Sequence, residues 1–239
     1  MADVFKKTVA ELAGTYIFFL SGFGSIVAFL SAIPNTSTPT LTPTGLFLIA
    51  IGFGMGIFIG IILVGHISGG HLNPAVTLSL FFAGKFEGRL VIPYIIAQLV
   101  ASVLAAGTIG VFFGFGTANL THFGATTPGS MGPYVALLAE FILTFFFLWT
   151  ILTIASRTTE VPVISAVLAV YITIMILIIG SISGGSVNPA RSFGPAVLSG
   201  ILLQGNYYQW IYWVGPVLGG ILGSFCFKFI NGDKAKIHF

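Results

Sequence analysis

The sequence predicts an all-α membrane protein with six transmembrane helices and two re-entrant half-helices in an inverted repeat. The first reason is composition: of 239 residues, 56% are hydrophobic and 6% are charged, and the mean hydropathy is +1.05. A water-soluble domain of this length needs far less apolar sequence. The second reason is a duplicated motif. SGGHLNPA at residues 68–75 matches SGGSVNPA at residues 183–190 in six of eight positions, at an offset of 115 residues.

Six apolar stretches have the length of membrane-spanning helices, about 20 residues for a hydrocarbon core of about 30 Å. We expect these helices at residues 9–32, 45–65, 90–112, 134–156, 162–180 and 209–230. The first stretch is longer than the apolar core of a signal peptide, and its Ala10-Glu11 start recurs at Ala139-Glu140. It is therefore expected to remain in the mature protein.

The stretches that follow the two Asn-Pro-Ala motifs, residues 74–83 and 189–200, are too short to cross. At a rise of 1.5 Å per residue they cover about 15–18 Å, roughly half the hydrocarbon thickness, so each is expected to be a half-helix. Asn is a favoured N-cap, and the following Pro lacks an amide hydrogen that would have no helical partner. The Ser-Gly-Gly runs suit extended re-entrant strands. Such non-helical backbone is tolerated inside a membrane where it lines a water-filled path.

Each half of the chain, about residues 1–115 and 130–239, thus holds three full spans. An odd number makes the second half enter the membrane from the opposite side, which gives an inverted repeat about an axis in the membrane plane. The Thr- and Gly-rich segment 113–133 is the expected linker. It is apolar and tied at both ends, so we expect one domain over residues 1–239.

Basic residues predict the topology of the chain. If the six spans alternate, all Lys and Arg except Arg191 fall on one side, which the positive-inside rule makes cytoplasmic together with both termini. They are Lys6, Lys7, Lys85, Arg89, Arg157, Lys228, Lys234 and Lys236. Scattered over loops, they form no basic face, so nucleic acid is not an expected partner.

Two short sequence features carry little weight. Cys226 is the only cysteine, so no internal disulfide can form and a buried apolar role is expected. Glycosylation sequons begin at Asn35 and Asn119, and we treat both as chance matches in Thr-rich loops.

Inverted symmetry brings the two helix caps face to face near the membrane midplane. Each Asn carbonyl would accept from the free amides of its own half-helix, which leaves the NH2 groups of Asn73 and Asn188 to donate to a water oxygen. Both helix dipoles point their positive ends at the same place and oppose cations, including a hydrated proton. Backbone carbonyls of the re-entrant strands would add a ladder of acceptors: Gly69, Gly70, His71 and Leu72, and Gly184, Gly185, Ser186 and Val187.

The GHISGGHLNPAVT run from Gly65 and the NPARSFG run from Asn188 resemble the aquaporin family, and the match covers essentially the whole chain. The resemblance implies an aquaporin-like fold and a homotetramer in the cell membrane with one pore per subunit. It also implies water as the main permeant, with small neutral solutes such as glycerol. It implies no cofactor, no metal and no catalytic residue.

The resemblance places a selectivity filter near the extracellular mouth, formed by Phe53, Ile176, Gly185 and Arg191. Arg191 lies one helical turn beyond Asn188, where a buried guanidinium would repel cations. Water-selective members usually carry His where this chain has Ile176, and in this it is similar to archaeal-type aquaporins. Polyols or dissolved gases are therefore expected to fit as well.

Glu11 and Glu140 are the only carboxylates inside the expected spans, at matching positions of the two halves. The family pattern assigns them to holding the re-entrant loops, while proton relay in a transporter is the alternative. By family spacing His66 belongs to a cytoplasmic vestibule. A metal site with His71 is not expected, because no Cys, Asp or third His is near in sequence.

Three other functions remain open. In glycerol facilitators the pore arginine is followed by Asp, whereas in this chain Arg191 is followed by Ser192, which resembles the water-channel branch. Ala196, Tyr212 and Trp213 fit the same branch. A secondary transporter would share the inverted repeats and broken helices, but it needs titratable or ion-binding groups at the midplane. An enzyme would need a catalytic arrangement, and no Ser-His-Asp set, nucleotide loop or metal cluster is visible.

Overall fold

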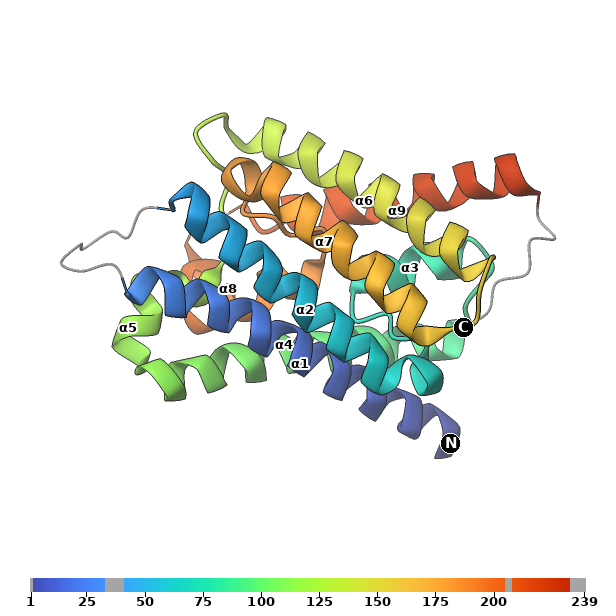
Figure 1. Ribbon diagram of the computed structural model, residues 1–239, viewed down its shortest axis with the longest axis horizontal. Coiled ribbons are helices and arrows are strands. Elements are labelled where there is room, and N and C mark those ends of the chain that lie inside the picture. The colour runs from blue at the N-terminus through green and yellow to red at the C-terminus, as the bar shows by residue number, and fades with distance from the viewer. Residues whose placement is uncertain (1, 33–40, 205–207, 233–239) are drawn as a thin grey trace.

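The computed structural model describes residues 2–32, 41–204 and 208–232. In this part of the chain, six helices are long and apolar enough to cross a membrane, and they lie alongside one another (Figure 1). They are α1 (Ala2–Ser31), α2 (Pro43–Ser68), α4 (Gly88–Phe113), α6 (Pro133–Ala155), α7 (Val161–Ser183) and α9 (Ile211–Asn231). The shorter α3 (Pro74–Phe82) and α8 (Pro189–Leu198) lie among them. The predicted all-α membrane fold is confirmed.

Several helices extend beyond the apolar runs that predicted them. α1 begins at Ala2 rather than at residue 9, and its first turns are polar, with an exposed Asp3–Lys7 ion pair of 3.5 Å. Hydropathy marks the part of a helix inside the hydrocarbon, whereas the helical hydrogen bonds continue into the interface. Helix length and apolar length therefore differ at this end.

α2 and α7 each run three residues past their predicted ends. Both stop at a glycine in the left-handed region, Gly69 with φ 86° and Gly184 with φ 83°, whose amide bonds back to a carbonyl four residues earlier. Glycine adopts this conformation without steric cost and is the usual helix terminator. The first glycine of each Ser-Gly-Gly run therefore ends a helix, and the extended strand begins after it.

Glycines set the closest helix contacts of the bundle. A Cβ at Gly219 or Gly223 of α9 would overlap the carbonyl oxygen of Phe141 or Phe145 on α6. Between α1 and α2, a Cβ at Gly56 would lie 2.6 Å from the carbonyl oxygen of Phe18. Because lipid removes the hydrophobic drive between helices, such close backbone packing is what holds them together.

The half-helices cross between the two halves of the chain. α3 packs against α9 and α8 packs against α4. In the first contact Gly220 of α9 faces the hydroxyl of Ser79, and in the second Gly194 of α8 faces Ser102 of α4. Each half-helix is thus lodged against a long helix from the other half, and the two halves interlock.

The segment predicted as the linker between the two halves contains helical structure. It forms α5 (Phe115–Leu120) and a 3-10 turn, η1 (His122–Gly124), and a further 3-10 turn, η2 (Ile201–Leu203), follows α8. The ring of Phe115 meets the buried ring of Phe123 edge to face at 5.9 Å. Apolar packing onto the bundle thus overrides the Thr- and Gly-rich composition. Asn119 lies in α5, whereas Asn35, Lys234 and Lys236 lie outside the described residues.

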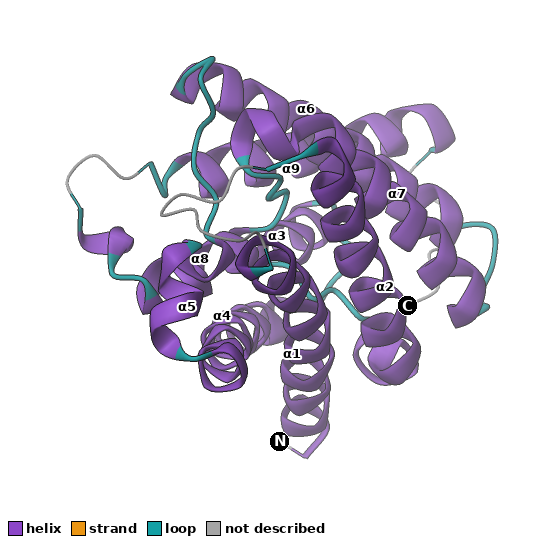
Figure 2. Cartoon of the chain, turned by 60° about the vertical axis from the view of Figure 1, so that its left-hand side comes forward, coloured by secondary structure: helices purple, strands orange, loops and turns teal. Residues whose placement is uncertain are grey.

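α1 begins and α9 ends at the same end of the bundle in Figure 1. This end also holds the α3–α4 connection and the end of α6. Together these four segments carry Lys6, Lys7, Lys85, Arg89, Arg157 and Lys228. Figure 2 shows the bundle closer to end-on, with α4 and α2 on either side of α1, against which both pack.

Candidate functional site

Two asparagines begin the half-helices as N-caps. Asn73 has φ −159°, and its Oδ1 accepts from the amide of Ala75 at 2.8 Å. Asn188 has φ −152°, and its Oδ1 accepts from Ala190 at 3.0 Å and from Arg191 at 3.4 Å. In both helices Pro follows the cap, so the side-chain oxygen satisfies amides that the helix leaves without a partner.

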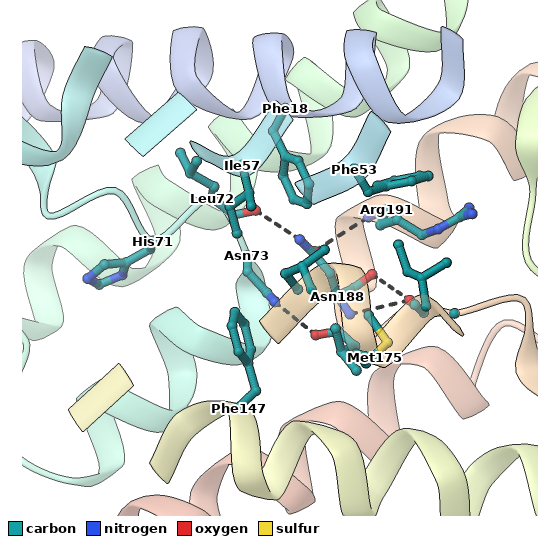
Figure 3. A pocket seen from close by; sticks show the side chains of 15 residues that line it. Phe18, Phe53, Ile57, His71, Leu72, Asn73, Phe147, Met175, Asn188 and Arg191 are labelled. Carbon is teal, nitrogen blue, oxygen red and sulfur yellow. Dashed lines mark hydrogen bonds between the residues drawn. The ribbon is translucent and has the colours of Figure 1, made fainter. Parts of the chain in front are cut away.

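The side-chain NH2 groups of the two caps reach across to the opposite strand. Asn73 Nδ2 donates to the carbonyl of Val187 at 2.8 Å, and Asn188 Nδ2 donates to the carbonyl of Leu72 at 2.9 Å (Figure 3). These two bonds between the halves were not predicted from the sequence. Since an NH2 has two hydrogens and a carbonyl two lone pairs, one of each remains for a ligand in the cavity.

The backbone is strained at the residues that accept these bonds. Leu72 has φ 51° and Val187 has φ 45°. Positive φ is uncommon for a non-glycine residue and an outlier for a β-branched one. Such conformations cost about 1–3 kcal/mol and persist where the surroundings enforce them, often at functional sites. Here the conformation turns each carbonyl toward the facing Asn. Nothing in the identity of Leu or Val signals it in the sequence.

Glu11 holds the first re-entrant strand. Its Oε1 accepts from the Ser68 hydroxyl at 2.8 Å and from the His71 amide at 2.9 Å. Its Oε2 accepts from the Leu72 amide and from Gln98 Nε2, both at 2.8 Å. Hydrogen bonds to an ionised acceptor are among the stronger ones, so this buried carboxylate fixes the strained turn.

Glu140 makes the matching bonds in the second half. It accepts from the Ser183 hydroxyl at 2.6 Å, from the Ser186 amide at 2.9 Å and from the Val187 amide at 2.6 Å. Both carboxylates are fully buried, and neither is among the residues that line the cavity described next. Their geometry fits loop support.

A narrow cavity runs past the paired asparagines. In Figure 3, His71 lies on one side of the pair and Arg191 on the other, and Phe18 and Phe147 flank it. The cavity offers about 10 Å³ to water, about what a single molecule needs. Its wall is mainly apolar, with a few polar groups. The lining residues are Phe18, Phe53, Ile57, His71, Leu72, Asn73, Phe147, Ile172, Met175, Ile176, Gly185, Ser186, Val187, Asn188 and Arg191.

Three of the four expected filter residues stand where this cavity opens into a wider one. Phe53, Ile176 and Arg191 line both the narrow cavity and a cavity of about 250 Å³ next to it, while Gly185 lines the narrow side only. The side chains of Phe53, Ile176 and Arg191 are all buried. The structure thus brings the four predicted residues together at one junction.

Arg191 is held from two sides. Its Nη1 donates to the carbonyl of Gly124 at 2.5 Å and its Nη2 to the carbonyl of Gly184 at 3.4 Å. Its guanidinium carbon lies 5.0 Å from the centre of the Phe53 ring and 5.8 Å from that of Phe23, within cation–π range. Backbone carbonyls and ring faces therefore orient the charge toward the junction.

The histidines do not form a metal site in the described part of the chain, which has no group of three or more His, Cys, Asp or Glu that could bind a metal. His66 is exposed in the last turn of α2. His71 lines the narrow cavity, with Nδ1 3.0 Å from the Thr77 hydroxyl and its ring 4.4 Å from that of Phe86. Cys226 is half-buried on α9 and lines neither cavity.

The sequence profile of the family described as "Major intrinsic protein" matches residues 1–227. The chain belongs to the major intrinsic protein family. It is 35% identical to "Aquaporin NIP1-1" of Zea mays, over 95% of this chain and 75% of that protein. It is also 35% identical to "Aquaporin AqpM" of Methanothermobacter marburgensis, over 98% of this chain and 100% of that protein. The resemblance to aquaporins is confirmed.

A solved structure agrees with this assignment. The aquaglyceroporin from Plasmodium falciparum matches with a TM-score of 0.84 and 25% identity, over 95% of this chain and 97% of that one. The agreement covers nearly the full length of both chains, so the six spans and the two half-helices of this major intrinsic protein belong to one shared fold.

In this major intrinsic protein, sequence reasoning missed several residues that hold the site. The hydroxyls of Tyr94 and Tyr212 donate to the carbonyls of Ser68 and Ser183, both at 2.8 Å, where α2 and α7 end. Both tyrosines lie near the start of the third span of their half, which was a usable signal. Gly124 lies in the linker and gave no comparable signal in the sequence, because only its backbone carbonyl contacts Arg191.

Proposed function

We propose that this chain is a passive channel that conducts water in single file, excludes protons and ions, and passes some small neutral solute such as glycerol. One observation carries the proposal. Two Asn amides meet at a cavity with room for about one water molecule, each at the N-terminus of a half-helix. A water oxygen at that point finds two donors, and both helix dipoles favour the orientation that presents its oxygen to them.

Proton exclusion follows from that orientation. A water that accepts from Asn73 and Asn188 directs its own hydrogens away from the pair, toward its neighbours on either side. Proton hopping needs a chain of waters that all donate in one direction, and the pair reverses that direction. The positive ends of the helix dipoles raise the energy of a hydronium ion at the same place.

The junction at Phe53, Ile176 and Arg191 selects among neutral molecules. Arg191 supplies a fixed positive charge and several donors, so a cation is repelled while a hydroxyl group can accept. Phe53 and Ile176 supply an apolar wall on which a carbon backbone can rest. Water needs only the polar side of the junction.

A glycerol facilitator is the second candidate. It is favoured by Ile176, which makes the junction more apolar than a His would, and by the similarity to a chain described as an aquaglyceroporin. Ser192 argues for the water-channel branch. The ratio of the two permeabilities decides between these candidates.

A secondary transporter and an enzyme are less well supported. A transporter would use titratable groups in its pathway, whereas Glu11 and Glu140 are occupied by strand amides and hydroxyls away from the cavity. Hydrolytic catalysis would require a nucleophile with an adjacent base, and the residues lining the cavity supply no such pair.

Stopped-flow light scattering on vesicles containing the purified protein tests the channel proposal. Osmotic water flux should rise far above that of empty vesicles, and an enclosed pH-sensitive dye should show no matching proton flux when a pH gradient is imposed. Proton flux in proportion to water flux would refute the exclusion mechanism. Water flux that requires a proton gradient would indicate a transporter.

We also propose a homotetramer of four separate pores, with both termini in the cytoplasm and with the two halves as copies of one unit. The resemblance supports the tetramer, and the basic residues at one end of the bundle support the orientation. Light scattering of the detergent-solubilised protein measures the oligomeric state. The orientation can be checked by introducing a cysteine beside Lys85 or beside Thr121 and labelling it from either side of a cell membrane.

A further inference from the structure

Two phenylalanine rings flank the asparagine pair in the narrow cavity. Phe18 comes from α1 and Phe147 from α6, and in Figure 3 they approach the pair from opposite sides. Both side chains are buried. The junction with the wide cavity lies further along, on the Arg191 side of the pair. The two rings therefore border the passage at a different level from the junction.

Each ring has a fixed relation to the carboxylate that holds a re-entrant strand. Phe18 follows Glu11 by seven residues, and Phe147 follows Glu140 by seven. Seven residues make nearly two helical turns, so each Glu and its Phe share one face of their helix, about 10 Å apart along the axis. In both halves, the helix face that supports the strand also presents an aromatic ring to the cavity.

A pair of isoleucines completes the apolar wall around the asparagines. Ile57 of α2 and Ile172 of α7 are related by the same 115-residue offset as the two motifs, and both are buried and line the narrow cavity. These side chains and the two rings have no hydrogen-bonding group. Polar partners for a permeant at this level come from the asparagines and the strand carbonyls.

The two rings are held in place by their neighbours. Phe18 stacks on Phe19 with ring centres 4.7 Å apart. Phe147 stacks on Tyr171 at 5.2 Å, and the Tyr171 hydroxyl donates to the carbonyl of Leu143 at 2.7 Å. Close-packed interiors leave little room for a ring to swing aside. The size of the two side chains therefore sets the width of the passage beside the asparagines.

The space beside the rings suits water far better than a polyol. The narrow cavity offers about 10 Å³ to water, whereas the wide cavity beyond the junction offers about 250 Å³. Glycerol is several times larger than one water molecule and carries three hydroxyls, but each asparagine NH2 keeps only one hydrogen free. A buried hydroxyl without a partner is costly, so glycerol loses both fit and hydrogen bonds at this level.

We propose that Phe18 and Phe147 form a second solute filter at the asparagine pair, which limits the passage of small polyols relative to water. This filter acts in series with the junction at Phe53, Ile176 and Arg191. The proposal rests on the channel function proposed above and adds two specificity-determining residues to it.

Stopped-flow light scattering on vesicles that contain each purified variant tests the second filter. Phe18→Leu and Phe147→Leu remove a ring but keep an apolar side chain, so the passage widens while water keeps its polar partners. A one-methylene difference in an apolar fit changes discrimination by about tenfold at the low end of its range. Because the junction still acts in series, we expect each variant to raise the glycerol-to-water ratio roughly threefold, and the double variant to raise it further.

Phe227→Leu is the matched control. This ring is also buried, but it lies on α9 and lines neither cavity, so the same loss of core volume should leave the ratio unchanged. Monodisperse elution shows which variants are folded, and Phe147→Met is a milder change that replaces Phe147→Leu if the latter does not fold.

An unchanged ratio in the folded ring variants, or an equal rise in Phe227→Leu, would overturn the second filter. Failure of the proposed channel function has a different signature, because the unmodified protein would then give no more water flux than empty vesicles.

Discussion

Ile176 sets the polarity of the junction between the narrow and the wide cavity. Its side chain is buried beside Gly185, where a Cβ would lie 3.4 Å from Ile176 Cγ1, and it lines both cavities with Phe53 and Arg191. The junction thus has one strongly polar side and one apolar side. A solute with a carbon backbone can use both sides, whereas water uses one.

Replacing Ile176 with His should lower glycerol permeability relative to water. The imidazole adds polar atoms to the apolar wall, so a polyol backbone loses its contact surface while water keeps its partners. A change in fit of this kind is worth about 1–3 kcal/mol, so we expect the glycerol-to-water ratio to fall roughly tenfold or more. Stopped-flow light scattering measures both fluxes. Ile176→Val should leave the ratio nearly unchanged, and an unchanged ratio in the folded His variant would mean that this side chain does not face the solute.

Mercurials should inhibit the unmodified channel weakly. Its only thiol, Cys226, is on α9 and lines neither cavity. Gly185→Cys should make water flux sensitive, because it places a thiol at the junction. The new side chain must adopt φ 63°, which costs about 1–2 kcal/mol. Gly185→Ala carries the same strain without the thiol, so it should stay insensitive. Strong block of the Cys226→Ser variant would show that mercury acts elsewhere.

At this scale, the sequence revealed residues whose side-chain chemistry marks their role. Asn73 and Asn188 stand in a duplicated motif, and Arg191 follows the second copy. Polar and charged groups inside a membrane segment usually have a functional role. Gly124 holds Arg191 through a backbone carbonyl, and Phe23 meets it as an apolar ring among many. Neither contribution depends on a distinctive residue type, so only the folded chain reveals it.

The re-entrant strands are the elements on which the channel depends, and each is held by one carboxylate. Glu140 alone satisfies the amides of Ser186 and Val187. These two bonds hold Val187 at its positive φ, which a β-branched residue disfavours. If the strand relaxed away from Glu140, both buried amides would lose their acceptor.

Glu140→Ala should destabilise the protein and reduce water flux. Each buried amide left without an acceptor costs about 1–3 kcal/mol. Glu140→Gln keeps one acceptor oxygen at similar volume, so it should lose less stability and retain conduction. The stability of the unmodified protein and the two variants can be compared by heating each in detergent and measuring the loss of monodisperse elution. If Gln abolished transport while stability was kept, the carboxyl group would be acting as a proton carrier.

Element boundaries were predictable where a single physical rule sets them. Asn-Pro caps placed the starts of α3 and α8 correctly, because capping is local chemistry. The helical turns inside the linker were not predicted, because α5 and η1 are held by contacts with distant elements, such as Gly124 against Ile26. The amino-acid composition of the linker does not indicate which distant residues it contacts.

Across the whole molecule, each half-helix packs against a long helix of the other half through one small-residue contact. The contacts differ in what opposes the glycine. A Cβ at Gly220 would overlap the Ser79 hydroxyl and next meet Leu148 Cδ2 at 3.1 Å. A Cβ at Gly194 would overlap both the hydroxyl and the backbone of Ser102. One clash can be relieved by trimming a side chain, and the other cannot.

Gly220→Ala and Gly194→Ala should each destabilise the protein by about 1–3 kcal/mol, as overpacking does. Within the part of the chain that the structure describes, the buried Ser79 hydroxyl has no hydrogen-bond partner. Ser79→Ala should therefore cost little by itself and should restore most of the stability lost in Gly220→Ala. Ser102→Ala should not rescue Gly194→Ala, because the backbone clash stays and the hydroxyl's bond to the carbonyl of Ala190, at 2.5 Å, is lost.

A double-mutant cycle for each pair, measured by thermal unfolding, gives the two coupling energies. Gly107→Ala is the control, since a Cβ there meets no atom of the described residues within 4 Å. A helical Gly→Ala change should be neutral or stabilising by up to about 1 kcal/mol. Gly194→Ala should also raise the glycerol-to-water ratio, because α8 carries Arg191 and any shift of this helix moves the charge at the junction. Equal rescue in both cycles would mean that the half-helices adjust independently and that the two halves are not interlocked at these contacts.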